Sequence, residues 1–196
     1  MATAAVNPIH EAGISVEGEL GAVAERLRRS TVRVLGDDGC GSGVIWRPDG
    51  VIVTNAHVAR SGIQRVELAD CREFSGKVIV RDAKRDLAAI RIEGHGFPSI
   101  TVRDARTLRA GEMVIAVGNP MGEVGAASVG IVHSAPQNRS LVVADIRLFP
   151  GNSGGPLADV EGRVVGINTL VVAGLGCAIP SNAVARFLRG LGIVAR

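Results

Sequence analysis

Short apolar runs alternate with polar turns along most of the chain, and this period indicates β-strands rather than helices. In the first half, runs rich in valine and isoleucine predict strands at 31–35, 43–46, 51–54, 65–68, 76–80 and 87–92. In the second half, similar runs predict strands at 113–117, 126–133, 141–146, 156–158, 163–170 and 176–179. Two series of about six short strands are typical of paired antiparallel barrels, so we predict an all-β fold.

The two ends of the chain depart from this pattern. Residues 1–17 have no clear period and are predicted to form a flexible arm. The apolar positions in 18–30 are spaced like one face of a short helix. Those in 181–191 predict a second helix, with Ser181 as its N-cap. The strands are therefore expected to lie between two short helices.

Turn signals divide the strands into two groups. The segment 47–50 reads Arg-Pro-Asp-Gly, which suits a type I turn, and it is expected to join two strands as a hairpin. The glycine-rich and polar stretch 94–111 is expected to contain the linker between the barrels. We accordingly assign the first helix and barrel to 18–100, and the linker, second barrel and closing helix to 101–196.

Composition narrows the class of protein. The chain has 196 residues, of which 46% are hydrophobic and 3% aromatic, and 26 are glycine. This apolar content excludes an intrinsically disordered chain and predicts an aliphatic core. The net charge is +3 with basic and acidic residues interspersed, so we expect no nucleic-acid partner. Three cysteines without CxxC spacing predict reduced thiols, and we expect no metal site and no cofactor.

No segment is apolar over enough residues to predict a membrane span. The first residues also lack the basic region and apolar run of a secretory signal. As written, the chain is expected in the cytoplasm. A periplasmic or secreted protein with a trimmed N-terminus is the alternative.

Three segments place reactive side chains beside strand ends or glycines. His57 follows the predicted strand 51–54, and imidazole is the side chain best suited to move a proton near neutral pH. Asp86 precedes the apolar strand at 87–92. Taken singly, His57 is more simply a structural histidine, and Asp86 a solvated strand cap.

The third segment is the loop 149–157, which reads Phe-Pro-Gly-Asn-Ser-Gly-Gly-Pro-Leu. A serine becomes a nucleophile only when a base accepts its proton, and acyl transfer also needs N–H donors for the new oxyanion. Glycines around Ser153 permit backbone conformations with positive φ, so the N–H groups of Gly151 and Ser153 can converge on one point. An ordinary turn explains this order of residues poorly, which favours a nucleophile loop.

Together the three segments resemble the chymotrypsin-fold serine proteases, and more narrowly the HtrA (DegP/DegQ) family. The motifs that carry the resemblance are Thr-Asn-Ala-His-Val, Asp-Leu-Ala-Ala-Ile and Gly-Asn-Ser-Gly-Gly-Pro-Leu, in this order. The similarity extends over roughly residues 31–190. It implies two six-stranded antiparallel Greek-key β-barrels with short N- and C-terminal helices.

By this resemblance, His57 and Asp86 in the first barrel and Ser153 in the second form a catalytic triad. Ser153 would attack the scissile carbonyl, His57 would accept its proton and return it to the leaving amine, and Asp86 would hold the imidazole. The backbone N–H groups of Gly151 and Ser153 would form the oxyanion hole.

The resemblance also implies residues for substrate binding. Leu148 takes the place of the pocket floor, and an aliphatic floor predicts cleavage after small or medium apolar residues. Arg147 replaces the small residue usual beside it, and an inward-facing Arg147 would favour acidic residues instead. Cys177 stands near the pocket wall, where the family often has phenylalanine. The strand expected to pair with the substrate backbone contains Asn168, Thr169 and Leu170.

We therefore expect a serine endopeptidase that hydrolyses unfolded or flexible polypeptides through an acyl-enzyme. The alternative is a chaperone-like or adaptor-like binding module that holds exposed strands without cutting them. HtrA proteins usually carry PDZ domains after the protease, and none fits before Arg196, so we expect a minimal protease domain. Because the family often trimerises through its N-terminal segment, residues 1–30 are our candidate for self-association into a trimer.

Overall fold

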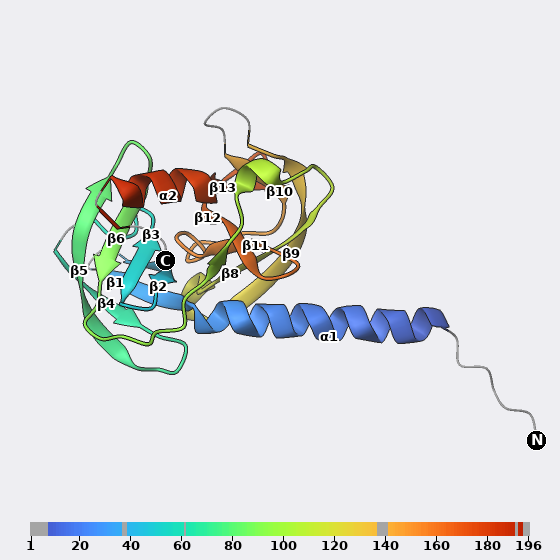
Figure 1. Cartoon of the computed structure of the whole chain (residues 1–196), viewed down its shortest axis with the longest axis horizontal. Coiled ribbons are helices and arrows are strands. Elements are labelled where there is room, and N and C mark those ends of the chain that lie inside the picture. Colours follow the sequence, from blue (N-terminus) through green and yellow to red (C-terminus); the bar gives the residue numbers. More distant parts are fainter. Residues whose placement is uncertain (1–7, 37–38, 61, 137–140, 191, 194–196) are drawn as a thin grey trace, which may run out of the picture.

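Six strands of the first half pair into a closed antiparallel barrel, at the left of Figure 1. The computed structural model describes residues 8–36, 39–60, 62–136, 141–190 and 192–193. The strands of this barrel are β1 (Thr31–Gly36), β2 (Gly39–Arg47), β3 (Val51–Thr54), β4 (Ile63–Glu67), β5 (Glu73–Asp82) and β6 (Leu87–Arg91). Their order around it is β1-β2-β3-β6-β5-β4. The predicted turn joins β2 to β3, with the Gly50 N–H donating to the Arg47 carbonyl at 3.2 Å.

The second half forms the second barrel. Its elements are β7 (Thr101–Val102), η1 (Ala105–Thr107), β8 (Met113–Gly118), η2 (Pro120–Gly122), β9 (Ala126–Ser134), β10 (Val142–Asp145), β11 (Pro156–Asp159), β12 (Arg163–Val172) and β13 (Leu175–Pro180). The order is β11-β8-β9-β10-β13-β12, and a β11–β12 pairing closes the ring. The prediction of two six-stranded antiparallel barrels is thus confirmed. The short strand β7, which adds in parallel to β12, was not predicted.

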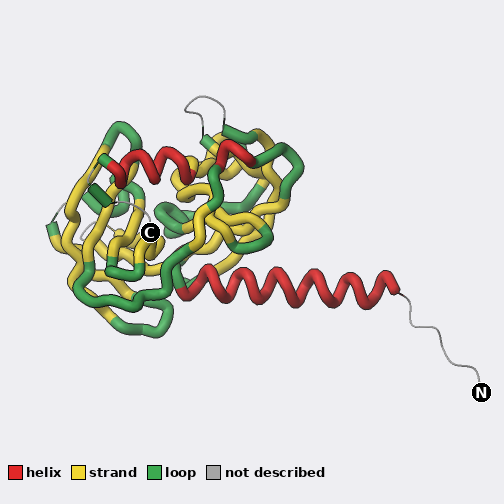
Figure 2. Tube along the Cα trace, in the orientation of Figure 1, coloured by secondary structure: helices red, strands yellow, loops and turns green. Residues whose placement is uncertain are grey.

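An α-helix longer than predicted precedes the barrels and projects beyond them in Figure 2. This helix, α1, spans Pro8–Arg29, so residues 8–17 of the expected arm are helical. Residues 1–7 lie outside the described residues. Residues 8–17 have no clear apolar period and include Gly13, which explains why the pattern located only the C-terminal part of α1.

The closing helix, α2 (Ser181–Arg189), confirms the second helix, but its N-cap is Pro180 rather than Ser181. The Ser181 hydroxyl accepts a hydrogen bond from the Ala105 N–H at 3.0 Å and donates one to the Arg103 carbonyl at 2.5 Å. Partners far along the chain thus replace the local cap that the sequence predicted. Among the helices of the described residues, none is both long and apolar enough to cross a membrane.

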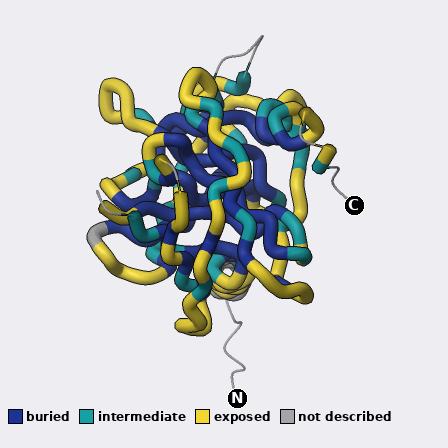
Figure 3. The backbone as a smooth tube through the Cα atoms, turned by 90° about the vertical axis from the view of Figure 1, so that its left-hand side faces the viewer, coloured by how far each residue is buried: buried dark blue, intermediate teal, exposed yellow. Residues whose placement is uncertain are grey.

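A shared layer of apolar side chains holds the two barrels and both helices together. It includes Leu27 of α1, Trp46 of β2, Val53 of β3, Val117 of β8, Ile167 of β12 and Leu188 of α2. None of these side chains is more than 6% exposed, and Figure 3 shows the buried backbone running through the centre of the molecule. Since such interiors are close-packed, the barrels hold loops from both halves in a fixed relative position.

A charged cluster ties the segment between the barrels to the second barrel. Asp159, which is 2% exposed, accepts hydrogen bonds from Arg163 Nε at 2.9 Å and from Arg103 Nη1 at 3.4 Å. Arg103 also donates to Glu112 at 2.7 Å. The Arg103 guanidinium, helped by Arg109 and opposed by burial, lowers the pKa of Glu112 from 4.5 to about 2.

We expect Glu112→Gln to lower the free energy of unfolding near pH 7 by about 1 kcal/mol, the size of a solvent-screened ion pair. The folded-state pKa is depressed, so the contribution is complete above the unfolded-state value of 4.5 and is lost as the pH falls towards about 2. Thermal unfolding should show a Tm lower by about 2–4 °C at neutral pH, and this difference should vanish in acid. Glu161→Gln removes a more exposed ion pair with Arg163 and is the control. An equal loss in both variants would contradict the role of Glu112.

Candidate active site

His57 and Asp86 lie in the loops that follow β3 and precede β6. These strands pair antiparallel with Thr54 opposite Ala88, so the end of one lies beside the start of the other. Asp86 has a φ of 54°, a left-handed conformation that aspartate adopts more readily than most residues. Strand pairing and this turn together bring the two side chains to the same edge of the first barrel.

The His57 ring and the Asp86 carboxylate are directly hydrogen-bonded. His57 Nδ1 lies 2.9 Å from Asp86 Oδ2 and 3.0 Å from Oδ1, and the His57 backbone N–H donates to Oδ1 at 3.0 Å. Because an ionised carboxylate only accepts, the neutral ring carries its hydrogen on Nδ1 and leaves the lone pair on Nε2. The His57 side chain is 50% exposed, so the ring is accessible to a substrate.

Two further side chains orient Asp86. The Thr169 hydroxyl, from the second barrel, donates to Asp86 Oδ2 at 2.7 Å, and the Asn55 amide donates to the Asp86 backbone carbonyl at 3.0 Å. Burial raises the pKa of Asp86, but hydrogen bonds from His57 and Thr169 outweigh it and hold this pKa below its ordinary value. Asp86 is therefore ionised at neutral pH.

Sequence reasoning missed the contacts that Thr169 and Asn55 make with Asp86. Thr169 was expected only on the substrate-binding strand, and its partner lies 83 residues away along the chain. No periodicity or turn signal marks a contact of that range. Asn55 carried a weak signal, since it stands two residues before His57 in the motif.

Ser153 lies between β10 and β11 in two successive tight turns. The Asn152 N–H donates to the Phe149 carbonyl at 2.9 Å and closes the first turn. The Gly155 N–H donates to the Asn152 carbonyl at 3.0 Å and closes the second. Ser153 follows their shared residue and is therefore held at a sharp reversal of the backbone.

Glycine is required at the third position of each turn. Gly151 has a φ of +103° and Gly154 a φ of +86°, values that L side chains disfavour and type II turns demand. A Cβ on Gly151 would also lie 2.4 Å from the Asn119 carbonyl oxygen, and one on Gly154 would lie 2.0 Å from that of Ser42. These two glycines explain the glycine-rich order of the loop that the sequence singled out.

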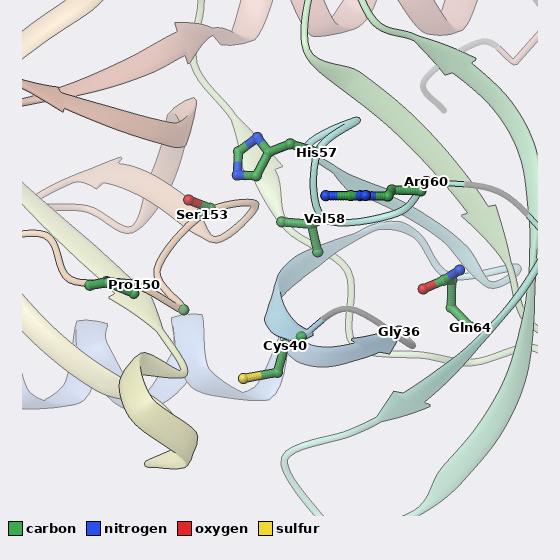
Figure 4. A pocket seen from close by; sticks show the side chains of 10 residues that line it. Gly36, Cys40, His57, Val58, Arg60, Gln64, Pro150 and Ser153 are labelled. Carbon is green, nitrogen blue, oxygen red and sulfur yellow. The ribbon is translucent and has the colours of Figure 1, made fainter.

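Ser153 and His57 line the mouth of the same pocket, where Figure 4 shows them as neighbours. Ser153 Oγ donates to the Thr169 carbonyl at 3.2 Å, and among the described residues no hydrogen bond joins it to His57. Catalytic hydrogen bonds are often long before substrate binds, and a serine side chain has other staggered rotamers to adopt when substrate arrives. The fold thus gathers His57, Asp86 and Ser153 from two barrels into one site.

The N–H groups of Gly151 and Ser153 are available to a ligand. Within the described part of the chain, neither donates to a backbone carbonyl. The Gly151 N–H belongs to the central peptide of its turn, so the turn offers it no acceptor. Gly151 and Ser153 lie in the two successive turns of one loop, so their N–H groups stay the candidates for an oxyanion hole.

The pocket beside Ser153 and His57 has a volume of about 400 Å³. Most of its wall belongs to the first barrel, with Cys40, Val58, Arg60 and Gln64 visible in Figure 4. Pro150 and Gly151 complete it from the second barrel, whereas β12 and β13 contribute no residue. The site therefore has one binding space on the side of the first barrel.

A second hollow, of about 280 Å³, contains Leu148 and Arg147. Leu148 is half-buried against the core of the second barrel, and a Cβ on Gly176 would lie 3.0 Å from its Cδ1. Arg147 is exposed, and no ion pair involves it among the described residues. Cys177 is 4% exposed, and burial raises the pKa of its thiol, so it packs within β13 rather than presenting a reactive group.

The end of β12 has a free edge. Leu170, Val171 and Val172 pair with β13, and no other described strand pairs with them. All three side chains are between 43% and 56% exposed. An unpaired edge of this kind accepts an additional strand.

Asn168 lies in a different environment from the one the sequence predicted. It is 1% exposed, and its side-chain amide donates to the Pro156 carbonyl at 2.9 Å. Its carbonyl accepts from Gly154 N–H and its own N–H donates to the Gly155 carbonyl, both at 2.9 Å. Because all these groups are used internally, Asn168 braces the Ser153 loop rather than facing a substrate.

The cysteines and acidic residues provide no further reactive cluster in the described residues. Cys40, Cys71 and Cys177 are free thiols. No group of three or more histidine, cysteine, aspartate or glutamate residues gathers there in a way that could hold a metal ion.

Known proteins similar to this chain share one activity in their names. A family model described as a trypsin-like peptidase domain matches residues 41–167, which include all three reactive residues. A probable periplasmic serine endoprotease, DegP-like, of Chlamydia muridarum is 37% identical over 155 residues, 72% of this chain and 31% of that protein. A putative serine protease HhoB of Synechocystis sp. is 36% identical over 158 residues, 74% of this chain and 38% of the relative. Serine protease HTRA1 of Xenopus tropicalis is 37% identical over 161 residues, 76% of this chain and 35% of the relative. The chain thus spans about a third of the length of these relatives.

Proposed function

This chain belongs to the family of trypsin-like peptidases, and on that basis we propose that it is a serine endopeptidase acting on unfolded or flexible polypeptides. One observation carries the proposal: a serine on a glycine turn lies beside a histidine whose Nδ1 is 2.9 Å from a carboxylate. Nucleophile, base and orienting acid are the three parts that peptide hydrolysis by serine requires.

In the proposed reaction, Ser153 Oγ attacks the carbonyl carbon of the scissile bond while its proton passes to His57 Nε2. The new C–O bond displaces the carbonyl π electrons onto oxygen, and the N–H groups of Gly151 and Ser153 stabilise this oxyanion. Asp86 stabilises the imidazolium, because both of its carboxylate oxygens lie within 3.0 Å of Nδ1.

The tetrahedral intermediate then collapses into products. The C–N bond breaks, His57 gives its proton to the leaving amine, and an ester remains on Ser153. Water attacks this ester as His57 takes one of its protons, and that proton returns to Ser153 when the acid product leaves. The pocket of about 400 Å³ beside His57 suits the leaving segment, since His57 delivers the proton there.

We propose that the acyl side of the substrate adds as a strand to the free edge of β12, near Leu170. Pairing through backbone groups requires an extended, unpaired peptide, which unfolded or flexible segments supply. Leu148 closes the adjacent hollow with an aliphatic surface, so small or medium apolar side chains are favoured before the cleaved bond.

We expect the protein to cleave a library of fluorogenic peptides after alanine, valine or similar residues. The matched variant is Arg147→Ala, because Arg147 is exposed at the rim of the hollow while Leu148 forms its apolar surface. Arg147→Ala should reduce cleavage after acidic residues by about 3- to 10-fold, the effect of one screened charge pair, and leave cleavage after apolar residues unchanged. Loss of apolar cleavage in this variant would show that Leu148 does not set the preference.

Casein separates the proposal from its alternative. An endopeptidase converts casein into fragments, whereas a chaperone-like or adaptor-like module retains it intact on a column of the immobilised protein. Intact casein together with stable binding would favour the non-cleaving module.

We also propose an oligomeric state and a cellular location. The projecting helix α1 is our candidate for self-association into a trimer, since its N-terminal part extends beyond the barrels in Figure 1. For location, the DegP-like relatives carry the word periplasmic in their names, which supports the periplasmic alternative over the cytoplasmic prediction.

A further inference from the structure

We propose that Ser42 is a positioning residue that holds residues 149–153, which we call the oxyanion loop, in the conformation needed for catalysis, with Asn119 as its support. We call these two residues the loop clamp. The inference rests on the proposed function, because it concerns the same reaction. It assigns a role to two side chains that do not touch the substrate.

The Ser42 side chain holds the loop at the peptide that follows Gly151. Ser42 is fully buried in β2, and its hydroxyl donates to the Gly151 carbonyl at 2.7 Å. The N–H of the same peptide, on Asn152, donates to the Phe149 carbonyl at 2.9 Å. The peptide plane is thus fixed from both sides, and its rotation would break both hydrogen bonds. This plane adjoins Gly151, and in our proposal holding it limits the orientations open to the preceding peptide, which carries the Gly151 N–H.

The backbone of Ser42 contacts two other catalytic segments. Its N–H donates to the Ser153 carbonyl at 2.8 Å. Its carbonyl accepts from the Thr54 hydroxyl at 2.6 Å, at the end of β3 just before the His57 turn. Ser42 of the first barrel therefore contacts Gly151, the proposed nucleophile Ser153, and Thr54 at the end of the strand that precedes His57.

Asn119 fixes the Ser42 hydroxyl in turn. The Asn119 backbone N–H and side-chain amide donate to Ser42 Oγ at 2.9 and 3.1 Å. A hydroxyl has one donor and two acceptor sites, so these two bonds leave its hydrogen to point at Gly151. The Asn119 amide also donates to the Val32 carbonyl at 3.0 Å, which anchors the clamp in β1.

Two further hydrogen bonds connect the loop clamp to the N-terminal helix. Asn119 Oδ1 accepts from the Gly125 N–H at 3.0 Å, and the Gly125 carbonyl accepts from Arg28 Nε at 2.5 Å. Arg28 lies in the last turn of α1. The support of the oxyanion loop is therefore continuous with the helix that projects from the barrels.

We expect Ser42→Ala to lower kcat for a peptide substrate by about 10- to 100-fold, somewhat less than direct removal of an oxyanion donor. KM should change by less than about 3-fold, since the ground state does not use the oxyanion hole fully. A peptide aldehyde, whose adduct with Ser153 places an oxyanion in the hole, should bind more weakly by a factor similar to that in kcat.

Ser181→Ala is the matched control. Ser181 is also buried, and its hydroxyl likewise accepts from a backbone N–H and donates to a backbone carbonyl, but it lies at the start of α2. Its removal should lower Tm to a similar extent and leave kcat and aldehyde binding unchanged. Equal losses of kcat in both variants, or a folded Ser42→Ala with wild-type kcat, would overturn the proposal.

Two additional measurements test the proposal if Ser42→Ala does not fold or if the wild type cleaves no peptide. If Ser42→Ala does not fold, the nearly isosteric Ser42→Cys, whose thiol is a weak donor, is judged by the same kcat and aldehyde criteria. Amide hydrogen exchange at Asn152 should be faster by about 10-fold in the Ser42 variant and unchanged in the Ser181 variant. If the wild type cleaves no peptide, the proposed function fails, and this exchange rate still decides whether the clamp holds the loop.

Discussion

Ser153→Ala is expected to lower kcat for peptide hydrolysis by on the order of 10⁶-fold, the loss typical when a serine nucleophile is removed from a triad. The variant lacks the oxygen that we propose forms the acyl-enzyme beside His57. Labelling by a fluorophosphonate probe at about pH 8 should disappear with it, because the probe needs the same activated oxygen. Gel fluorescence of the labelled chain and release of a fluorogenic product measure the two effects.

Stability and binding provide the controls for this variant. Within the described residues, Ser153 Oγ makes a single hydrogen bond, of 3.2 Å to the Thr169 carbonyl, so Tm should change little. The folded variant should still retain casein on a column, since the β12 edge is untouched. Residual labelling or hydrolysis at the wild-type rate would identify a different nucleophile.

Asp86→Asn is expected to reduce kcat by about 10⁴-fold while the chain stays folded. Asparagine tolerates the left-handed φ of 54° at this position, so the turn should persist. The NH2 group is best placed at the Oδ2 position, because the other position faces the His57 backbone N–H, which can only donate, whereas the Thr169 hydroxyl near Oδ2 is also an acceptor. From there it donates to Nδ1, which moves the ring hydrogen to Nε2 and removes the base. Peptide cleavage assays measure the loss of kcat. NMR of the His57 ring identifies which nitrogen carries the hydrogen.

Asp82→Asn is the matched control for Asp86→Asn. Asp82 precedes the same turn, where it accepts hydrogen bonds from the N–H groups of Lys84 and Arg85 at 3.0 and 3.1 Å. The substitution makes the same chemical change four residues away and should lower stability without a loss of kcat. A comparable loss of kcat would mean that the turn, rather than the carboxylate on His57, is responsible.

The local pattern of apolar and polar residues was sufficient to predict most of the fold. The alternating runs located the strands of both barrels, because a strand with one buried face leaves a period of two in the sequence. The pattern could not find β7, since two residues have no period and its pairing depends on β12. It placed the N-cap of α2 at Ser181, whose hydroxyl instead bonds to the Arg103 carbonyl across the fold. It also found only the C-terminal part of α1, since residues 8–17 have no clear apolar period.

For the candidate site too, the sequence predicted one part and not another. Motif order and glycine spacing led to His57, Asp86 and Ser153, because each motif is a local unit of strand end, turn and reactive side chain. Asn168 was assigned to substrate binding from its motif alone, but its backbone and side chain are used to brace the Ser153 loop. Which groups of a strand remain free for a ligand depends on all its neighbours, and a local motif does not show which neighbours these are.

The sequence by itself determined the class of fold, the family motifs and the identity of the three reactive residues. Only the tertiary structure decided which atoms meet: the Thr169 hydroxyl on Asp86 Oδ2, the Ser42 hydroxyl on the Gly151 carbonyl, and the Ser153 hydroxyl on Thr169. The reason is physical. Hydrophobic period and turn chemistry are local properties of the chain, whereas a hydrogen bond requires two atoms within about 3 Å at a suitable angle. Here the close packing of two barrels sets those positions, and residues far apart in the chain share them.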